Sequence, residues 1–441
     1  MRGSFAHIGR SSIAAAALAL GLSLGAGVFA VPAAVAKDAP KATNSPEFGK
    51  VAGPFQKTLT EVQAKKGKVS DAEFKTDAAG LIPQLAAMET SVKTPLDKII
   101  FGQWQYMVGG WADDAVLGNK GLQNMLDSGQ LPADKTLLVS AMLGQNAYSA
   151  KDYATAIKVL GPLASNPSVQ DVVPEMLVES YASNGQPKEG LAALKSAIAA
   201  RKAANVAVPE EWYARANRIA YNSKLPSESI EWALAMAAAY PSQLNWLSAA
   251  QLVRNSSTSF TSQEELDVSR LMDQSGALKL EPKYVEREYV AYLQAIDARR
   301  FPGEAVRITE QGLSTGALKA EDTFVKDTLA QARPRIAPDK ASLPGLAKDA
   351  AAAPNGKVAM AAADAYLAYG EAAKADELFT LALTKGGIDA DKDRVLTRLG
   401  IAQIDEGKYA DAKATLAKVT GPRVPIAQLW STFAEQKASA K

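Results

Sequence analysis

The chain has 441 residues, no cysteine, one histidine (His7), and 49 basic against 47 acidic side chains. The absence of cysteine excludes disulfides and a lipid-modified cysteine. His7 lies in the N-terminal segment that we expect to be cleaved off, so the mature chain has neither histidine nor cysteine, which excludes His-dependent nucleophilic catalysis and zinc or copper sites of ordinary type. A nearly neutral chain also lacks the basic excess with which proteins usually bind nucleic acid.

Residues 1–36 have the pattern of a cleaved signal peptide. Arg2 and Arg10 give a basic start, residues 13–30 form an apolar run, and residues 34–36 (Ala-Val-Ala) are the small residues that a signal peptidase reads. The alternative is a retained membrane anchor, which three glycines and Pro32 disfavour. Cleavage leaves 47 basic and 47 acidic residues, because the segment holds two arginines and no acid. We therefore expect a periplasmic protein without an integral membrane span, with a disordered lead over residues 37–44.

Residues 45–131 are expected to form an N-terminal helical region. Ser45-Pro46-Glu47 combines a capping residue, a proline at the first helical position and an acid in the first turn. Apolar residues then recur at spacings of three and four along the chain, and no run alternates as a strand would. The sequence predicts an all-α protein.

From residue 132 to residue 420, similar segments return at nearly constant spacing. Leu143-Gly144 followed by Tyr153 and Leu160 matches Leu399-Gly400 followed by Tyr409 and Leu416. A small residue marks the centre of each second helix, and the steps between these residues are 34, 39, 76, 70 and 37. They are Ala156, Gly190, Ser229, Ala305, Ala375 and Ala412. The two long steps are close to double, so each is expected to contain one more helical hairpin: residues 244–253 with 263–272, and residues 322–332 with 346–353.

This pattern resembles the tetratricopeptide repeat, a helix-turn-helix unit of 34 residues. The resemblance implies a right-handed α-solenoid of stacked antiparallel helix pairs, with small residues where two helices cross closely. Lys151, Lys224 and Arg300 replace the turn glycine seen at Gly185, Gly370 and Gly407.

Proline marks two further boundaries. Three prolines within residues 333–344 indicate an interruption, either an interdomain hinge or a long loop, and the loop is the preferred interpretation. Pro422 and Pro425 end the last repeat. Residues 421–441 are expected to be a C-terminal capping helix and tail, which hides the open end of a solenoid.

Motifs that suggest chemistry have simpler structural explanations. The acidic run at residues 389–393 resembles the start of a calcium loop, but Arg394 and Gly400 stand where that loop needs glycine and glutamate, so helix capping is preferred. The acid pairs at residues 113–114 and 210–211 are expected at helix N-termini. The tryptophans are spread over several hairpins, which indicates packing rather than a sugar-binding surface. We expect no metal and no cofactor.

The functional prediction rests on the concave surface that the resemblance implies. In tetratricopeptide arrays the first helices of successive repeats line a groove that binds an extended peptide or a helix. The positions that this places in the groove are Gln145, Tyr148, Glu175, Glu179, Arg218, Tyr221, Asn222, Gln294 and Asp297. The lysine with which one subtype clamps a peptide carboxylate is absent from the matching positions, where residues such as Ala141 and Ala214 stand. The sequence thus predicts an exported scaffold or adaptor, in cell-envelope assembly or transport, that binds a protein or peptide. The alternative is a periplasmic α-helical carbohydrate-active enzyme that uses carboxylates.

Overall fold

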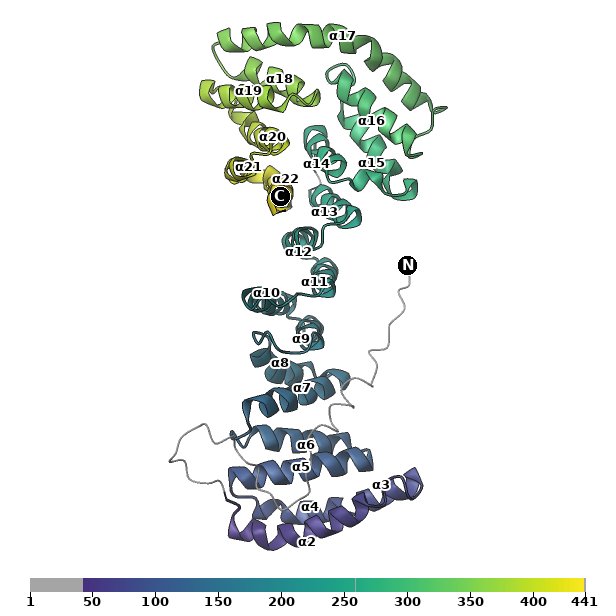
Figure 1. The fold of residues 1–441 in the computed structure, drawn as a ribbon, viewed down its shortest axis with the longest axis vertical. Coiled ribbons are helices and arrows are strands. Elements are labelled where there is room, and N and C mark those ends of the chain that lie inside the picture. The colour runs from purple at the N-terminus through teal and green to yellow at the C-terminus, as the bar shows by residue number, and fades with distance from the viewer. Residues whose placement is uncertain (1–42, 258, 440–441) are drawn as a thin grey trace. The chain divides into compact units, whose positions relative to one another are not determined.

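The computed structural model describes residues 43–257 and 259–439, and every regular element in this part of the chain is a helix (Figure 1). The expectation of an all-α fold is confirmed. The signal peptide expected over residues 1–36 and most of the expected lead at residues 37–44 lie outside the described residues. Among the residues described, no helix has both the length and the apolar character that crossing a membrane requires. The chain divides into two compact units, Met1–Ala207 and Val208–Lys441.

The described part of unit 1 is a succession of helices in which neighbours along the chain pack together. Its α-helices are α2 (Pro46–Gln63), α3 (Asp71–Ala79), α4 (Ile82–Met88), α5 (Pro95–Ala112), α6 (Ala115–Leu126), α7 (Ala133–Ser149), α8 (Tyr153–Leu160), α9 (Val172–Ser183) and α10 (Pro187–Ala203).

Asp97 joins the start of the described chain to helix α5. Its carboxylate accepts hydrogen bonds from the Ser45 hydroxyl (2.7 Å) and from the backbone N–H groups of Ser45, Lys93 and Thr94. The Ser45 hydroxyl in turn caps α2 by accepting from Phe48 N. Burial alone would raise the pKa of Asp97, but the hydrogen bonds from Thr94, Ser45 and Lys93 hold it below its ordinary value. One buried carboxylate therefore fixes the beginnings of two helices.

Helices α5 and α6 approach more closely than side chains would allow. A Cβ atom at Gly121 would lie 2.4 Å from the carbonyl oxygen of Gly102, and one at Gly109 would lie 2.5 Å from the Gly118 nitrogen. Real Cβ atoms essentially never come this close to a backbone. The glycines at this crossing let the two backbones touch.

The repeat pattern is carried by the same contact in both units. Gly144 on α7 packs against Leu160 of α8, and a Cβ atom there would lie 2.2 Å from the leucine side chain. Gly400 on α20 meets Leu416 of α21 in the same way. The small residues at the centres of the second helices are all buried, as the pattern predicts.

Unit 2 consists of further helix pairs. Its α-helices are α11 (Glu210–Asn222), α12 (Pro226–Ala239), α13 (Gln243–Asn255), α14 (Ser262–Gln274), α15 (Pro282–Ala295), α16 (Pro302–Ser314), α17 (Thr323–Ala352), α18 (Lys357–Ala368), α19 (Ala372–Lys385), α20 (Lys392–Asp405), α21 (Tyr409–Leu416) and α22 (Val424–Ser439). The first of the two additional hairpins is present, since residues 244–253 lie in α13 and residues 263–272 lie in α14.

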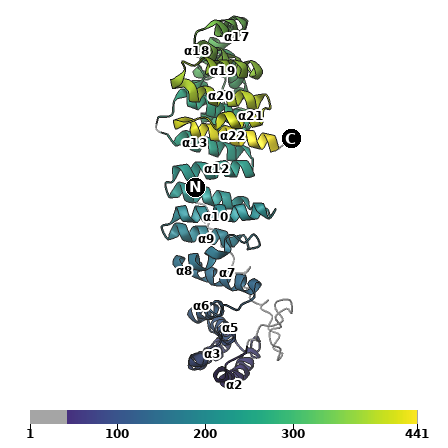
Figure 2. The ribbon, with the colours of Figure 1, turned by 90° about the vertical axis from the view of Figure 1, so that its left-hand side faces the viewer.

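The prediction of a second additional hairpin, at residues 322–332 and 346–353, is wrong. Residues 323–352 form the single 30-residue helix α17 rather than two helices and a loop, and Pro334, Pro338 and Pro344 lie inside it. Each proline removes one backbone hydrogen bond and pushes against the preceding turn, which bends a helix without ending it when packing holds both halves. Buried side chains at Val325, Ala332, Leu343 and Ala350 provide that packing. Figure 1 shows α17 as one long helix above α16, α18 and α19, and Figure 2 shows it again above α18 and α19.

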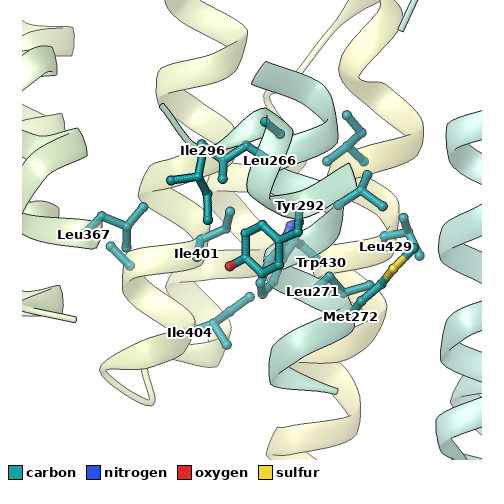
Figure 3. Packing of buried hydrophobic residues seen from close by; sticks show 14 of the residues in the cluster. Leu266, Leu271, Met272, Tyr292, Ile296, Leu367, Ile401, Ile404, Leu429 and Trp430 are labelled. Carbon is teal, nitrogen blue, oxygen red and sulfur yellow. The ribbon is translucent and has the colours of Figure 1, made fainter. Parts of the chain in front are cut away.

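Helix α22 connects the two ends of unit 2. It packs against α20 and α21, which precede it in the chain, and also against α12, α13 and α14. Figure 3 shows Leu271 of α14, Ile401 of α20 and Trp430 of α22 in one apolar cluster. The indole N–H of Trp430 donates to the Asp267 carbonyl at 3.0 Å, and that of Trp246 donates to Gln436 at 3.1 Å. The helices from α12 to α22 therefore form a closed array.

Candidate functional site

The nine predicted groove residues lie on both units. Gln145 and Tyr148 are on α7, and Glu175 and Glu179 are on α9, all in unit 1. The other five belong to unit 2, where Arg218, Tyr221 and Asn222 are on α11, Gln294 is on α15, and Asp297 is in the loop after it.

The four residues of unit 1 are half-buried. The Tyr148 ring lies edge-on to the Tyr153 ring, with centroids 6.1 Å apart, and packs against the apolar cluster between α7 and α9. Tyr148 thus contributes to packing within its own repeat.

Arg218 and Tyr221 line a groove in unit 2, with a volume of about 480 Å³, that runs over α11, α12 and α13. Tyr221 is 67% exposed and Leu244, on α13, is 53% exposed, which is unusual for side chains of their size in this chain. The remaining lining is mostly small or apolar: Ala214, Asn217, Ala233, Met236, Asn245, Ser248 and Leu252. The groove combines an apolar floor with one guanidinium and one phenol.

The other predicted residues of unit 2 lie away from this groove. Asn222 and Gln294 are exposed but are not part of its lining. The Asp297 carboxylate accepts from the Arg299 backbone N–H at 3.0 Å, which stabilises the turn between α15 and α16. The structure therefore brings together two of the five unit 2 residues.

A second hollow, with a volume of about 590 Å³ and open to solvent, is lined by helices of the closed array of unit 2. Its lining comes from α14, α15, α16, α17, α18 and α20, together with the residues that follow α18. The lining residues are Arg270, Asp273, Gln274, Tyr292, Gly303, Glu304, Arg307, Ile336, Lys340, Leu367, Ala368, Tyr369, Gly370, Ile401 and Asp405. We call this hollow the inner cavity.

Two pairs of charged side chains in the inner cavity neutralise each other. The Arg270 guanidinium binds Glu304 through two hydrogen bonds of 2.8 and 2.7 Å, and the Tyr292 hydroxyl donates to the same carboxylate at 2.9 Å. Arg307 binds Asp273 at 2.7 Å. Burial opposes the charge on Glu304, but Arg270 and Tyr292 hold the pKa of its carboxyl below the ordinary value.

Lys340 and Asp405 are the other charged residues of the lining. In the described part of the chain neither has an oppositely charged side chain within 4.0 Å. The Lys340 ammonium lies over the Tyr369 ring, 5.1 Å from its centroid. Asp405, the last residue of α20, accepts a hydrogen bond from Gln274 at 2.8 Å. Desolvation by the surrounding protein, only partly offset by this hydrogen bond and by the arginines of the lining, raises the pKa of the Asp405 carboxyl to about 6.

A buried charge network beside the inner cavity holds the closed array together. The Arg398 guanidinium binds Asp267 and Asp364, both at 2.8 Å, and Asp267 also pairs with Arg423. The side chains of Asp267, Asp364 and Arg398 are at most 1% exposed. Burial opposes the charge on Asp267, but Arg398 and Arg423 hold its pKa below the ordinary value.

These charged residues were not predicted from the sequence, although their spacing in the sequence marks them. Several ion pairs of unit 2 join residues 34 positions apart, the length of one repeat. Opposite charges at that spacing mark equivalent positions in adjacent repeats. The pairs are Arg254 with Glu288, Arg270 with Glu304, Asp273 with Arg307, and Asp364 with Arg398.

The acidic pairs and the tryptophans, for which the sequence analysis preferred capping and packing, largely have these structural roles. Asp114 caps α6 by accepting from Leu117 N at 2.9 Å, and the tryptophans at 104, 212, 232, 246 and 430 are buried. Asp391, at the start of α20, binds Arg394 instead of capping the helix with its side chain. The described residues contain no group of three or more acidic or histidine side chains that could hold a metal ion.

Comparison with known proteins gives little further information. The sequence matches no known family model. It matches no curated protein either. Among solved structures, a chain in the structure of Naa15/Naa10 bound to HypK-THB is 15% identical, and the match covers 86% of this chain and 70% of that one with a TM-score of 0.28. A likeness at this level carries no argument about function.

Proposed function

We propose that this protein is an exported, non-catalytic scaffold that binds a segment of a partner protein in the groove on α11, α12 and α13. The observation that carries the proposal is the pairing of Arg218 with the exposed Tyr221 and Leu244 above an apolar floor. Tyrosine and arginine are the residue types most enriched at binding hot spots. The basic start and small-residue site within residues 1–36 support export to the periplasm, and cell-envelope assembly or transport is the setting we favour.

The groove chemistry specifies the kind of segment that would bind. Met236 and Leu252 offer an apolar surface for an aliphatic or aromatic side chain. The Arg218 guanidinium at the rim suits a carboxylate of the partner, and the Tyr221 ring can cover the apolar anchor. We expect a short helical or extended segment with one large apolar side chain next to an acid.

The alternative, an enzyme that acts through two carboxylates, has weaker support. Asp273 and Glu304, the other carboxylates of the inner cavity, are each held by an arginine. A general acid or nucleophile must be available to the substrate. The lining therefore offers Asp405 without a second unpaired carboxylate.

The proposal is tested by affinity purification of the mature chain from envelope extracts, followed by binding measurements on the captured protein. The test variant is Arg218→Ala with Tyr221→Ala. The matched control is Arg287→Ala with Tyr284→Ala, which removes an exposed arginine and an exposed tyrosine from α15, outside the groove. Loss of a hot-spot side chain typically costs about 2 kcal/mol, so the groove variant should bind at least about 30-fold more weakly. Equal binding by both folded variants would exclude the groove.

A further inference from the structure

We propose that the inner cavity of unit 2 binds a short peptide with free ends, its ammonium group at Asp405 and its carboxylate at Lys340. This site is separate from the groove on α11–α13, and the inference does not depend on the proposed function. It rests on the two charged lining residues without an ion-pair partner in the described chain, one of each sign, and on the helix ends around them.

The Asp405 side of the cavity is built to attract a cation. Helix α14 ends at Gln274 and α20 ends at Asp405, and a hydrogen bond between these two lining residues brings the two helix ends together. The last carbonyl groups of a helix carry partial negative charge, so two such ends favour a positive group beside them. Gln274 donates to Oδ1 of Asp405 and orients the carboxylate.

The raised pKa of Asp405 fits this assignment. Desolvation lifts the pKa to about 6, because Arg270 and Arg307, whose charges are already paired with other carboxylates, offset only part of the loss of water. An ammonium group bound at the carboxylate would supply the missing charge and lower that pKa. Asp405 and Lys340 are both exposed to solvent, so a ligand can reach either charge.

The Lys340 side of the cavity is suited to an anion. The Tyr369 hydroxyl donates to Asp339 at 2.7 Å, which fixes the ring beneath the Lys340 ammonium. The ring holds the ammonium by a cation–π interaction and does not neutralise it. A carboxylate would complete the pairing on this side.

The volume of the inner cavity is suited to a small peptide. A volume of about 590 Å³ lies within the range of small-molecule sites and holds a peptide of roughly two or three residues. Apolar lining residues from three helices, Ile336, Leu367 and Ile401, can contact small apolar side chains.

Calorimetric titration of the full mature chain with trialanine tests the inference. Two blocked peptides, N-acetyl-trialanine and trialanine amide, each remove the charge at one end. Trialanine is expected to bind, and each blocked form is expected to bind at least about tenfold more weakly, because each loses one charge-assisted interaction.

Three variants assign the two ends. In Asp405→Asn, acetylation of the peptide should no longer weaken binding, while amidation still should. In Lys340→Gln, amidation of the peptide should no longer weaken binding, while acetylation still should. Lys348→Gln, which removes an exposed lysine from the same helix α17, should behave as the parent. A merely destabilised variant would lose affinity for all three peptides and would not lose discrimination at one end only. No binding of trialanine at millimolar concentration, or equal binding of all three peptides by the parent, would overturn the inference.

Discussion

The Arg398 guanidinium reaches across unit 2 to Asp267, which lies 131 positions earlier in the chain, and its Nε atom is 2.8 Å from Oδ1. Neither side chain is exposed to solvent. A buried charge without a partner costs several kcal/mol, so the folded state keeps both residues only while α14 and α20 are side by side. This pair therefore ties the closure of the helical array to its stability.

Replacing Arg398 should be strongly destabilising. Arg398→Met is expected to lower the free energy of unfolding by about 3 kcal/mol or more, because Asp267 and Asp364 both lose a buried partner. Urea unfolding followed by circular dichroism measures the change. Arg333→Met is the control, since Arg333 pairs with Glu310 at the surface and should contribute less than about 1 kcal/mol. Equal urea midpoints of unfolding for the two variants would mean that the buried pair is not important for the closure of the helical array.

Asp97 should make the stability of unit 1 depend on pH. Asp97→Asn is expected to cost about 2 kcal/mol near neutral pH, because a buried acceptor of several hydrogen bonds loses its charge. The native pKa lies below the unfolded value, so the stabilisation is full above the unfolded pKa and disappears as pH falls through the native one. The stability gap between parent and variant should therefore narrow in acid. Asp113→Asn, at an exposed site, is the control and should change the free energy of unfolding by less than about 1 kcal/mol.

Two lysines occupy turns that favour glycine. Lys151 and Lys224 have φ of 60° and 56°, in the left-handed region that Gly185 adopts at φ 79°. Lys151→Gly and Lys224→Gly should each stabilise the protein by roughly 0.5–1 kcal/mol, since a side chain is strained in this conformation. Gly185→Ala should destabilise the protein by about the same amount. Its Cβ would meet no other atom, so the only unfavourable effect is the strain of a side chain at positive φ. Differential scanning calorimetry should show a higher melting temperature for the two Lys→Gly variants and a lower one for Gly185→Ala.

The crossing of α5 and α6 should not accept a methyl group at Gly121. Gly121→Ala is expected to destabilise by about 2–3 kcal/mol, since its Cβ would collide with the Gly102 carbonyl and the Tyr106 backbone. Gly118→Ala, three residues earlier on the same helix, places its Cβ in open space and should be neutral or slightly stabilising. Similar melting temperatures for the two variants would contradict the close approach.

The sequence predicted the local and periodic features well because they depend on residues near in the chain. The buried small residues at Ala156 and Ala412, the capping by Ser45 and the α13–α14 hairpin all follow from spacing and residue type. The helix α17 was missed because three prolines normally end a helix, and their tolerance depends on tertiary packing that no local pattern reveals.

The closure of unit 2 could not be predicted from the repeat. A repeat pattern describes contacts between neighbouring hairpins, whereas Asp267 meets Arg398 across several of them. The inner cavity was missed for the same reason, since Lys340 and Asp405 are brought to it by helices far apart in sequence. Of the residues that line the groove on α11–α13, the resemblance named Arg218 and Tyr221 as candidates, whereas Leu244 and Met236 became visible only through the packing of α11, α12 and α13.

The claim that the groove on α11–α13 binds a protein segment is tested most directly by photocrosslinking from position 221. A photoreactive phenylalanine analogue would replace Tyr221 in the exported protein, and a second variant would carry it in place of Tyr284 on α15. We predict an adduct from position 221 whose crosslinked peptide has a large apolar residue next to an acid, with no matching adduct from position 284. The same adducts from both positions, or none from position 221, would contradict the account.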